Sequence, residues 1–180
     1  MPHCKKIVVL GPESTGKSTL CEQLAEKYKM VWVPEYARKF LHEIKRPYTY
    51  EDLLNIARGQ IELEDLITIS SNSPVVFIDT DMYVMKVWCE FVFGKCHHFI
   101  LDEIVKRKYD AYLLCNTDLP WIADELREYP DPESRRQLYL MYKDLLINQS
   151  VPWIEISGNY EERIQKAVSF MNQENIIEST

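Results

Sequence analysis

The chain alternates between short apolar runs and longer segments in which apolar residues recur every three or four positions. Short runs rich in β-branched and aromatic side chains are typical of buried strands. Five such runs occur, at residues 5–10, 30–33, 74–79, 110–115 and 151–156. The segments with helical periodicity are 17–28, 36–45, 51–70, 82–93, 98–108, 134–149 and 160–172.

Apolar strands separated by helices predict an α/β fold, with a parallel sheet covered by helices on both faces. No internal repeat or low-complexity linker divides the chain, so we expect residues 1–180 to form one domain. Ligands of such sheets bind beyond the carboxyl ends of the strands, and the segments there are the ones to read for chemistry. These segments are 11–18, 34–38, 79–81, 116–127 and 157–160.

The first of these segments, GPESTGKS at 11–18, fits the phosphate-binding pattern G-x-x-x-x-G-K-[ST]. Gly11 and Gly16 allow the loop to turn its N–H groups inward, and the following helix adds the positive end of its dipole. We expect Lys17 to meet the β and γ phosphates of a nucleoside triphosphate, and Ser18 to offer its hydroxyl to Mg²⁺. The segment expected to bind the triphosphate comprises Gly11, Pro12, Glu13, Ser14, Thr15, Gly16, Lys17, Ser18 and Thr19.

Carboxylates follow two other predicted strands. VVFIDTD at 75–81 ends a strand in Asp79, which suits a carboxylate near Mg²⁺. Asp81 is either a second functional group or the cap of the next helix. VPEYAR at 33–38 places Glu35 and Arg38 after the second strand, where Glu35 either takes the proton of a substrate hydroxyl or forms an ion pair with Arg38.

The segment NTDLPWIADELRE at 116–128 combines proline, tryptophan, acids and arginine, and it leads to Arg135 and Arg136. We interpret it as a lid in which Trp121 and Arg127 have functional roles. Arginines of a lid can neutralise charge that grows on a transferred phosphoryl group. The alternative is a solvated amphipathic segment with one packed tryptophan.

The last strand is followed by SGNY at 157–160. Gly158, Asn159 and Tyr160 either approach the base of the nucleotide or form a turn and a helix cap. Two other tryptophans, Trp88 and Trp153, are interpreted as core residues rather than ligand platforms.

Composition and charge narrow the class of partner. A net charge of −7 and a pI near 5.2 argue against nucleic acids and anionic membranes. No window approaches the ~20 apolar residues of a membrane span, and the first apolar run is too short for a signal peptide, so we expect a cytoplasmic protein. The five cysteines are scattered and are expected to be reduced, and Cys96-His97-His98 lacks a fourth ligand at metal-site spacing. A homo-oligomer is compatible with the sequence.

Among proteins that bind triphosphates, a small-molecule kinase with ATP and Mg²⁺ fits best. A GTPase is disfavoured because CNTD at 115–118 lacks the lysine of the guanine-reading N-K-x-D pattern. An AAA-type motor is disfavoured because 180 residues leave no room for its helical subdomain. Two alternatives remain open, a kinase for another nucleoside or deoxynucleoside and a regulatory ATP-binding module.

Four segments together, GPESTGKSTL, PEYAR, FIDTD and the stretch from NTDLPW to DELR, resemble the ribosylnicotinamide kinase domain of NadR-type NAD-biosynthesis proteins. The resemblance runs from Lys5 to Phe170. It implies a P-loop NTPase fold with three α/β/α layers and a lid. The strand order 2-3-1-4-5 is implied by the resemblance to nucleoside and nucleotide kinases. The resemblance to NadR-type proteins also implies ATP- and Mg²⁺-dependent phosphorylation of the 5′-hydroxyl of nicotinamide riboside, a small-molecule substrate, to nicotinamide mononucleotide.

The resemblance further implies roles for particular residues. It sets Asp79 or Asp81 near the metal and the substrate, and Glu35 and Arg38 beside the riboside. The residues implied for the substrate or lid region are Trp121, Asp124 and Arg127. Tyr36 and Trp121 are the aromatics expected nearest the cationic nicotinamide ring. The H-x-G-H nucleotidyltransferase motif of bifunctional members is absent from the sequence, so we expect a stand-alone kinase.

Overall fold

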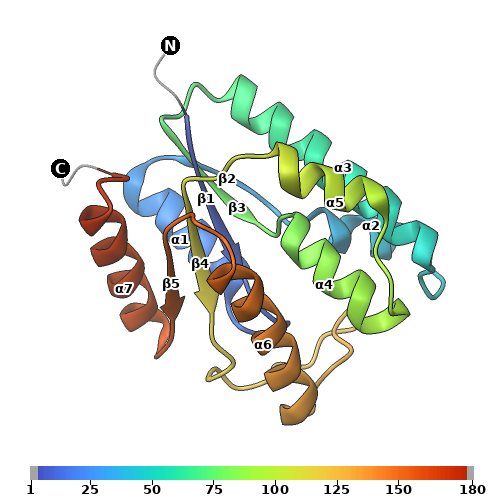
Figure 1. Ribbon diagram of the computed structural model, residues 1–180. Helices are drawn as coiled ribbons and strands as arrows, with labels where there is room; N and C mark the ends of the chain where they lie inside the picture. Colours follow the sequence, from blue (N-terminus) through green and yellow to red (C-terminus); the bar gives the residue numbers. More distant parts are fainter. Residues whose placement is uncertain (1–3, 178–180) are drawn as a thin grey trace.

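The computed structural model of the protein describes residues 4–177, and its elements follow the predicted order (Figure 1). The strands are β1 (Lys5–Leu10), β2 (Val31–Val33), β3 (Val75–Asp79), β4 (Ala111–Cys115) and β5 (Trp153–Ile156). The helices are α1 (Lys17–Tyr28), α2 (Tyr36–Ile44), α3 (Tyr50–Ser70), α4 (Met82–Phe93), α5 (His98–Lys106), α6 (Pro132–Ile147) and α7 (Tyr160–Gln173). All of the predicted strands and helices are present, with ends that differ by at most two residues from the prediction.

The strands form one parallel sheet in the order β2-β3-β1-β4-β5. The central strand β1 pairs with β3 on one side and with β4 on the other, and its residues Ile7–Leu10 have no exposed surface. Both the parallel arrangement and the strand order agree with the prediction.

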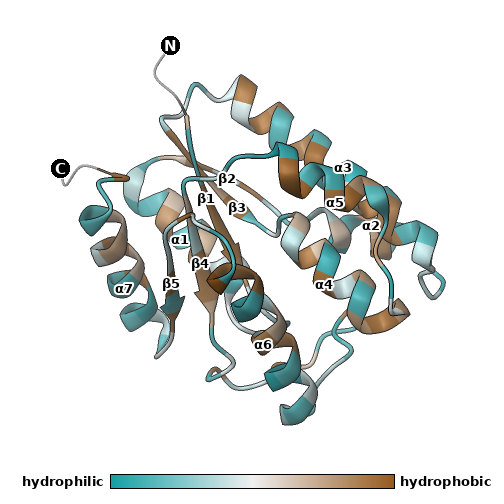
Figure 2. Cartoon of the chain, viewed as in Figure 1, coloured by the Kyte–Doolittle hydropathy of each residue, from teal (hydrophilic) through white to brown (hydrophobic). Residues whose placement is uncertain are grey.

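Helices cover both faces of the sheet. Ile7 and Val9 of β1 pack with α1 and α7 on one face, whereas Val8 and Leu10 pack with α4 and α6 on the other. Colouring by hydropathy shows apolar strands between helices whose outer sides are polar (Figure 2). The result is the predicted three-layer α/β/α sandwich.

A further group of helices packs together beside the sheet. Apolar side chains of α2, α3, α4 and α5 form a separate cluster around Met85 and Cys89. The long helix α3 begins with a capping box, in which the Thr49 hydroxyl accepts from the N–H of Asp52 and the Asp52 carboxylate accepts from the N–H of Thr49. This cluster fixes the position of α2, which carries predicted site residues.

The loops that follow the five parallel strands meet at one edge of the sheet, at the lower end in Figure 1. All the segments predicted to carry chemistry therefore lie at this edge. Over residues 4–177, we find no helix long and apolar enough to cross a bilayer.

Candidate functional site

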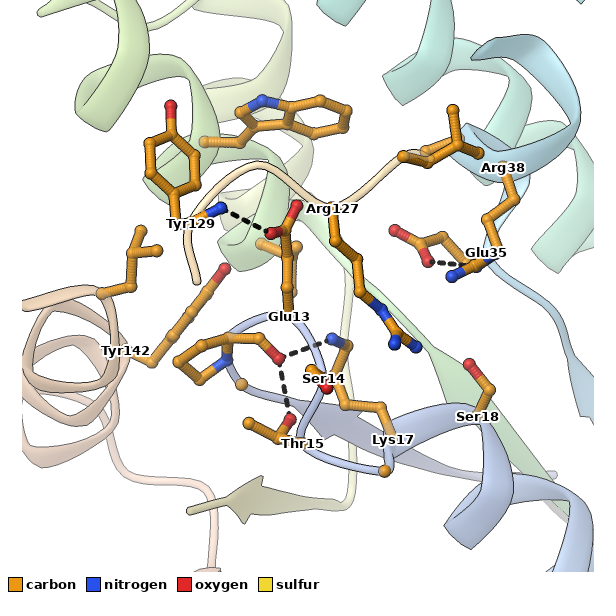
Figure 3. A pocket seen from close by; sticks show the side chains of 18 of the residues that line it. Glu13, Ser14, Thr15, Lys17, Ser18, Glu35, Arg38, Arg127, Tyr129 and Tyr142 are labelled. Atoms are coloured by element: carbon orange, nitrogen blue, oxygen red, sulfur yellow. Dashed lines mark hydrogen bonds and ion pairs between the residues drawn. The ribbon is translucent and has the colours of Figure 1, made fainter. Parts of the chain in front are cut away.

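The loop between β1 and α1 has the shape expected for phosphate binding. Gly11 and Gly16 have φ angles of 142° and 77°, a region that favours glycine. A Cβ atom on Gly11 would lie 2.6 Å from the carbonyl oxygen of Cys115, so the loop lies tightly against β4. The Pro12 carbonyl accepts from Thr15 Oγ1 at 2.7 Å and from Lys17 Nζ at 3.0 Å (Figure 3). The loop is thus braced by its own side chains, with Lys17 folded back over it.

A buried arginine that the sequence analysis did not single out holds three loops together. The Arg163 guanidinium donates to the carbonyl oxygens of Gly158 at 2.7 Å, Thr15 at 3.0 Å and Asn116 at 3.2 Å. It also forms an ion pair with Asp118. Because these partners follow β5, β1 and β4, Arg163 sets the position of the phosphate loop relative to its neighbours.

Ser18, in the first turn of α1, and Asp79, the last residue of β3, lie together. Ser18 Oγ donates to Asp79 Oδ2 at 2.5 Å, while Asp79 Oδ1 is buried without a hydrogen-bond partner among the described residues. Burial raises the pKa of Asp79 to about 6, and the nearby Glu35 carboxylate contributes, although Lys17 opposes the shift. The Ser18 hydroxyl and the partly unpaired Asp79 carboxylate are hard oxygen ligands of the kind that Mg²⁺ prefers. The residues present therefore fit the predicted metal.

Asp81 caps helix α4. Its carboxylate accepts from the N–H groups of Tyr83 at 3.0 Å and Val84 at 3.3 Å. Burial raises the pKa of Asp81 to about 7. Of the two roles that the sequence left open, the cap is the one seen, and Asp81 lines neither of the two hollows described below. Its predicted part in catalysis stays a prediction.

Glu35, Arg38 and Asp124 form a chain of charges from α2 to the lid. Arg38 Nη2 lies 2.9 Å from Asp124 Oδ2, and Arg38 Nε lies 3.9 Å from Glu35 Oε2. Glu35 is the residue that precedes α2, so its carboxylate is held at the end of the sheet. The structure thus brings together three residues that the sequence assigned to the substrate region.

The predicted lid, residues 116–128, lies over the phosphate loop together with the residues that connect it to α6. Two residues of that loop hold it by hydrogen bonds to its backbone. The Ile122 N–H donates to Ser14 Oγ at 2.9 Å, and the N–H groups of Glu128 and Tyr129 donate to Glu13 Oε2 at 2.9 Å and 3.3 Å. The lid and the phosphate loop therefore contact each other directly.

Arg127 extends from the lid toward the phosphate loop. Its Nη1 donates to the Ile122 carbonyl at 2.6 Å, and the guanidinium points toward Lys17 and Ser18 (Figure 3). This is the position needed to neutralise charge on a phosphoryl group bound at the loop.

A cavity of about 160 Å³ lies between the phosphate loop, α2, α4, α6 and the lid. At one end it is lined by polar and charged groups, and at the other by apolar and aromatic ones. The polar end includes Lys17, Ser18, Glu35, Arg38 and Arg127. The apolar end includes Leu41, Val84, Trp88, Phe91, Tyr129, Leu138 and Tyr142. A second, more open hollow includes Asp79, Asp124 and Tyr36, and it shares Ser18, Glu35, Arg38 and Arg127 with the first.

The aromatic side chains of the cavity are not those that the sequence analysis expected. Tyr36 lines the open hollow and packs its ring on Gly59 of α3, where an added Cβ would lie 2.2 Å from the ring. Trp121 lies in neither hollow, and the Arg135 guanidinium sits 5.6 Å from its ring centre. Trp88, interpreted as core, packs with the α2–α5 cluster and also lines the cavity.

Gly158, Asn159 and Tyr160 lie beside the phosphate loop but outside both hollows. Asn159 caps α7, and the Tyr160 ring would lie 3.4 Å from a Cβ on Gly16. The turn-and-cap geometry is present, and the predicted contact with a nucleotide base stays a prediction.

Comparison with known proteins agrees with this geometry. A family model described as an AAA domain matches residues 6–163. The matched segment contains the phosphate loop and the sheet, so the match does not bear on the helical subdomain of a motor. The chain is also 26% identical over 174 residues to the trifunctional NAD biosynthesis/regulator protein NadR of Escherichia coli K12, and equally to that of Salmonella typhimurium LT2. The alignment covers 94% of this chain but 42% of those proteins.

Solved structures share the fold. A crystal structure of NadR protein in complex with NR has a TM-score of 0.81 at 21% identity, and one in complex with NAD and AMP-PNP has a TM-score of 0.75. Both alignments cover 98% of this chain and 51% of the other. Thymidylate kinase from Candida albicans follows with a TM-score of 0.67 at 14% identity, covering 96% of this chain and 92% of its own. The resemblance to NadR and the P-loop kinase-like fold are thus confirmed.

Proposed function

The chain belongs to the AAA domain family of P-loop proteins, and from that premise we propose that it is an ATP-dependent kinase of nicotinamide riboside. The reaction would transfer the γ-phosphoryl group of ATP to the 5′-hydroxyl and give nicotinamide mononucleotide. The observation that carries the proposal is a cavity with one polar end at the phosphate loop and one aromatic end. The likeness to NadR, one structure of which is described as a complex with NR, supports the choice of substrate.

The polar end of the cavity has the groups that phosphoryl transfer to an alcohol requires. In this reaction the protein acts mainly by positioning the reactants and stabilising charge. Lys17 would leave the Pro12 carbonyl to meet the β and γ phosphates, and Arg127 would neutralise charge from the lid side. Glu35 is the carboxylate at this end of the cavity and would accept the proton of the 5′-hydroxyl.

Ser18 and Asp79 would hold Mg²⁺, through the serine hydroxyl and through the carboxylate or waters bound to it. When bound, the ion would neutralise negative charge on the phosphates. Asp79 suits this role because its Oδ1 is buried without a partner among residues 4–177.

The aromatic end of the cavity suits the nicotinamide ring, which carries a positive charge in the riboside. Aromatic faces attract a cation by roughly 0.5–2 kcal/mol. Trp88, Phe91, Tyr129 and Tyr142 line this end, and Arg38 and Arg127 lie at the opposite end. A neutral pyrimidine would gain the apolar contact without the electrostatic attraction.

The test is a panel of nucleosides assayed for ADP formation with ATP and Mg²⁺. We expect nicotinamide riboside to exceed uridine and cytidine by at least about tenfold in kcat/KM, as expected from roughly 1.4 kcal/mol of cation–aromatic attraction. Equal kcat/KM values for all of the nucleosides would indicate a general nucleoside kinase and would contradict the proposed preference for nicotinamide riboside. ADP formation that does not depend on any nucleoside would instead favour an ATP-binding module.

A further inference from the structure

The phosphate loop contains a carboxylate, Glu13, at a position where the neighbouring residues bind an anion. Its backbone lies in the loop, but its side chain points away from the loop toward the N–H groups of Glu128 and Tyr129 and lines the cavity (Figure 3). A negative charge aimed at the triphosphate would oppose binding, whereas a carboxylate in the acceptor cavity can accept hydrogen bonds from a ligand. The side chain of Glu13 therefore belongs to the acceptor side of the site.

The two oxygens of the Glu13 carboxylate have different surroundings. Oε2 accepts from the lid N–H groups of Glu128 and Tyr129, whereas Oε1 has no hydrogen-bond partner among residues 4–177. The side chain is partly buried, and burial raises the pKa of Glu13 while the two lid N–H groups and Lys17 oppose the shift. One oxygen thus holds the lid, and the other is left for a donor that enters the cavity.

The place of Glu13 along the cavity indicates what that donor is. In Figure 3 its carboxylate lies between the charged groups of Lys17 and Arg127 below and the ring of Tyr129 above, and the Tyr142 hydroxyl points toward it. A nucleoside with its 5′-hydroxyl at the charged end and its base at the aromatic end has its ribose at this level. The 2′- and 3′-hydroxyls of ribose are the donors that a nucleoside offers there.

We propose that Glu13 binds the ribose hydroxyls of the acceptor and so selects ribonucleosides over deoxyribonucleosides. This inference rests on the proposed function, because it needs a nucleoside in the cavity. A missing hydroxyl leaves Glu13 Oε1 without its donor in the occupied cavity, and sites built to hydrogen-bond a hydroxyl reject the analogue that lacks it. Because the same carboxylate holds the lid, ribose binding also stabilises the lid in its place over the phosphate loop.

The rival explanation is that Glu13 only holds the lid. The variant Glu13→Gln separates the two. Its amide oxygen can still accept from the lid N–H groups, but its NH₂ group cannot accept from a ribose hydroxyl. A role confined to the lid predicts that Glu13→Gln keeps the preference of the wild type for ribose.

A matched control is Ser14→Gly, which removes the hydroxyl that accepts from Ile122 N–H. Glycine tolerates the φ of 56° at this position. The substitution weakens the lid without changing the carboxylate of Glu13. We expect it to lower the rates with both sugars by the same factor.

The experiment measures kcat/KM with nicotinamide riboside and with its 2′-deoxy and 3′-deoxy analogues. We expect the wild type to favour the riboside over at least one analogue on the order of tenfold or more. That ratio should fall at least about fivefold in Glu13→Gln, because a neutral amide makes a weaker bond than a carboxylate, and should persist in Ser14→Gly. An unchanged ratio in Glu13→Gln, or a collapsed ratio in Ser14→Gly, would overturn the inference.

Calorimetric titration with the same three ligands separates this inference from the proposed function. Binding of the riboside at least about tenfold tighter than an analogue, in the wild type but not in Glu13→Gln, would support a ribose site even without turnover. Equal affinities in the wild type would overturn the inference while leaving the kinase proposal intact. If no nucleoside binds, both the ribose site and the proposed kinase function are contradicted.

Discussion

The packing of Tyr36 on Gly59 makes an unusual prediction for the substitution Gly59→Ala. In the interior of a helix this change ordinarily stabilises a protein by about 1 kcal/mol. Here the new Cβ would lie 2.2, 2.4 and 2.5 Å from three ring atoms of Tyr36. Overpacking of this kind costs roughly 1–3 kcal/mol, and three such contacts favour the upper end of the range. We therefore expect a net loss of about 2 kcal/mol in the free energy of unfolding.

The assay is denaturant unfolding of four proteins, the wild type, Gly59→Ala, Tyr36→Ala and the double variant. Removing the Tyr36 ring removes the clash, so Gly59→Ala should stabilise the Tyr36→Ala protein by up to about 1 kcal/mol. The sign of the effect thus reverses between the two backgrounds. A Gly59→Ala protein that is more stable than the wild type would refute this packing of α2 on α3. It would also refute the position of Glu35, which the packing determines.

Four other substitutions test the site and the fold. Lys17→Ala should lower kcat/KM on the order of a hundredfold or more, because it removes a charge at the desolvated phosphates, and wild-type turnover would contradict the kinase. Glu35→Gln should lower kcat with ATP affinity unchanged, and a normal kcat in this variant would show that Glu35 is not the proton acceptor. Asp79→Asn should instead raise the Mg²⁺ concentration needed for half-maximal rate. Asp52→Ala should lower stability at pH 7 by on the order of 1 kcal/mol, because it removes the carboxylate half of the capping box of α3 and the ion pair with Arg46. Bonding to the Arg46 guanidinium holds the pKa of Asp52 well below its usual range, so this stabilisation is complete above the unfolded-state pKa of about 4 and is lost as pH falls below it. The difference between Asp52→Ala and the wild type should therefore shrink in acid, and a difference independent of pH would contradict the ionic contribution.

The strands could be predicted because each is a short, mainly apolar run, and the three central strands β3, β1 and β4 are mostly buried. Ile7–Leu10 of β1 have no exposed surface, and burial on both faces leaves a continuous apolar pattern. The order of the strands could not come from that pattern, since many orders bury the same residues. It came from the resemblance to nucleoside and nucleotide kinases.

The sequence pattern could not distinguish the residues at the aromatic end of the cavity from residues of the hydrophobic core. Val84, Trp88 and Phe91 are spaced by four and three residues on α4, and the side chains that fill a core have the same spacing. The position of Tyr36 did leave a signal, because a glycine within a helix pattern indicates a close approach by another group. Gly59 is that glycine, and its contact explains why Tyr36 packs on α3.

Contacts between distant segments account for the rest of the site. Glu13 meets the N–H of Glu128 across 115 positions of the chain, and Arg163 meets the Thr15 carbonyl across 148. Neither pairing has a local pattern, since any exposed acid or any helical arginine looks the same in the sequence. Only the fold brings these residues together.

The most direct test of the account uses ATP with a labelled γ-phosphoryl group, together with Mg²⁺, nicotinamide riboside and the wild-type protein. Mass spectrometry then measures the label in nicotinamide mononucleotide and the amount of ADP, with the Lys17→Ala protein as control. We expect labelled mononucleotide and ADP in equal amounts from the wild type, and far less of both from Lys17→Ala. Release of the label as inorganic phosphate, with no mononucleotide formed, would contradict the central claim.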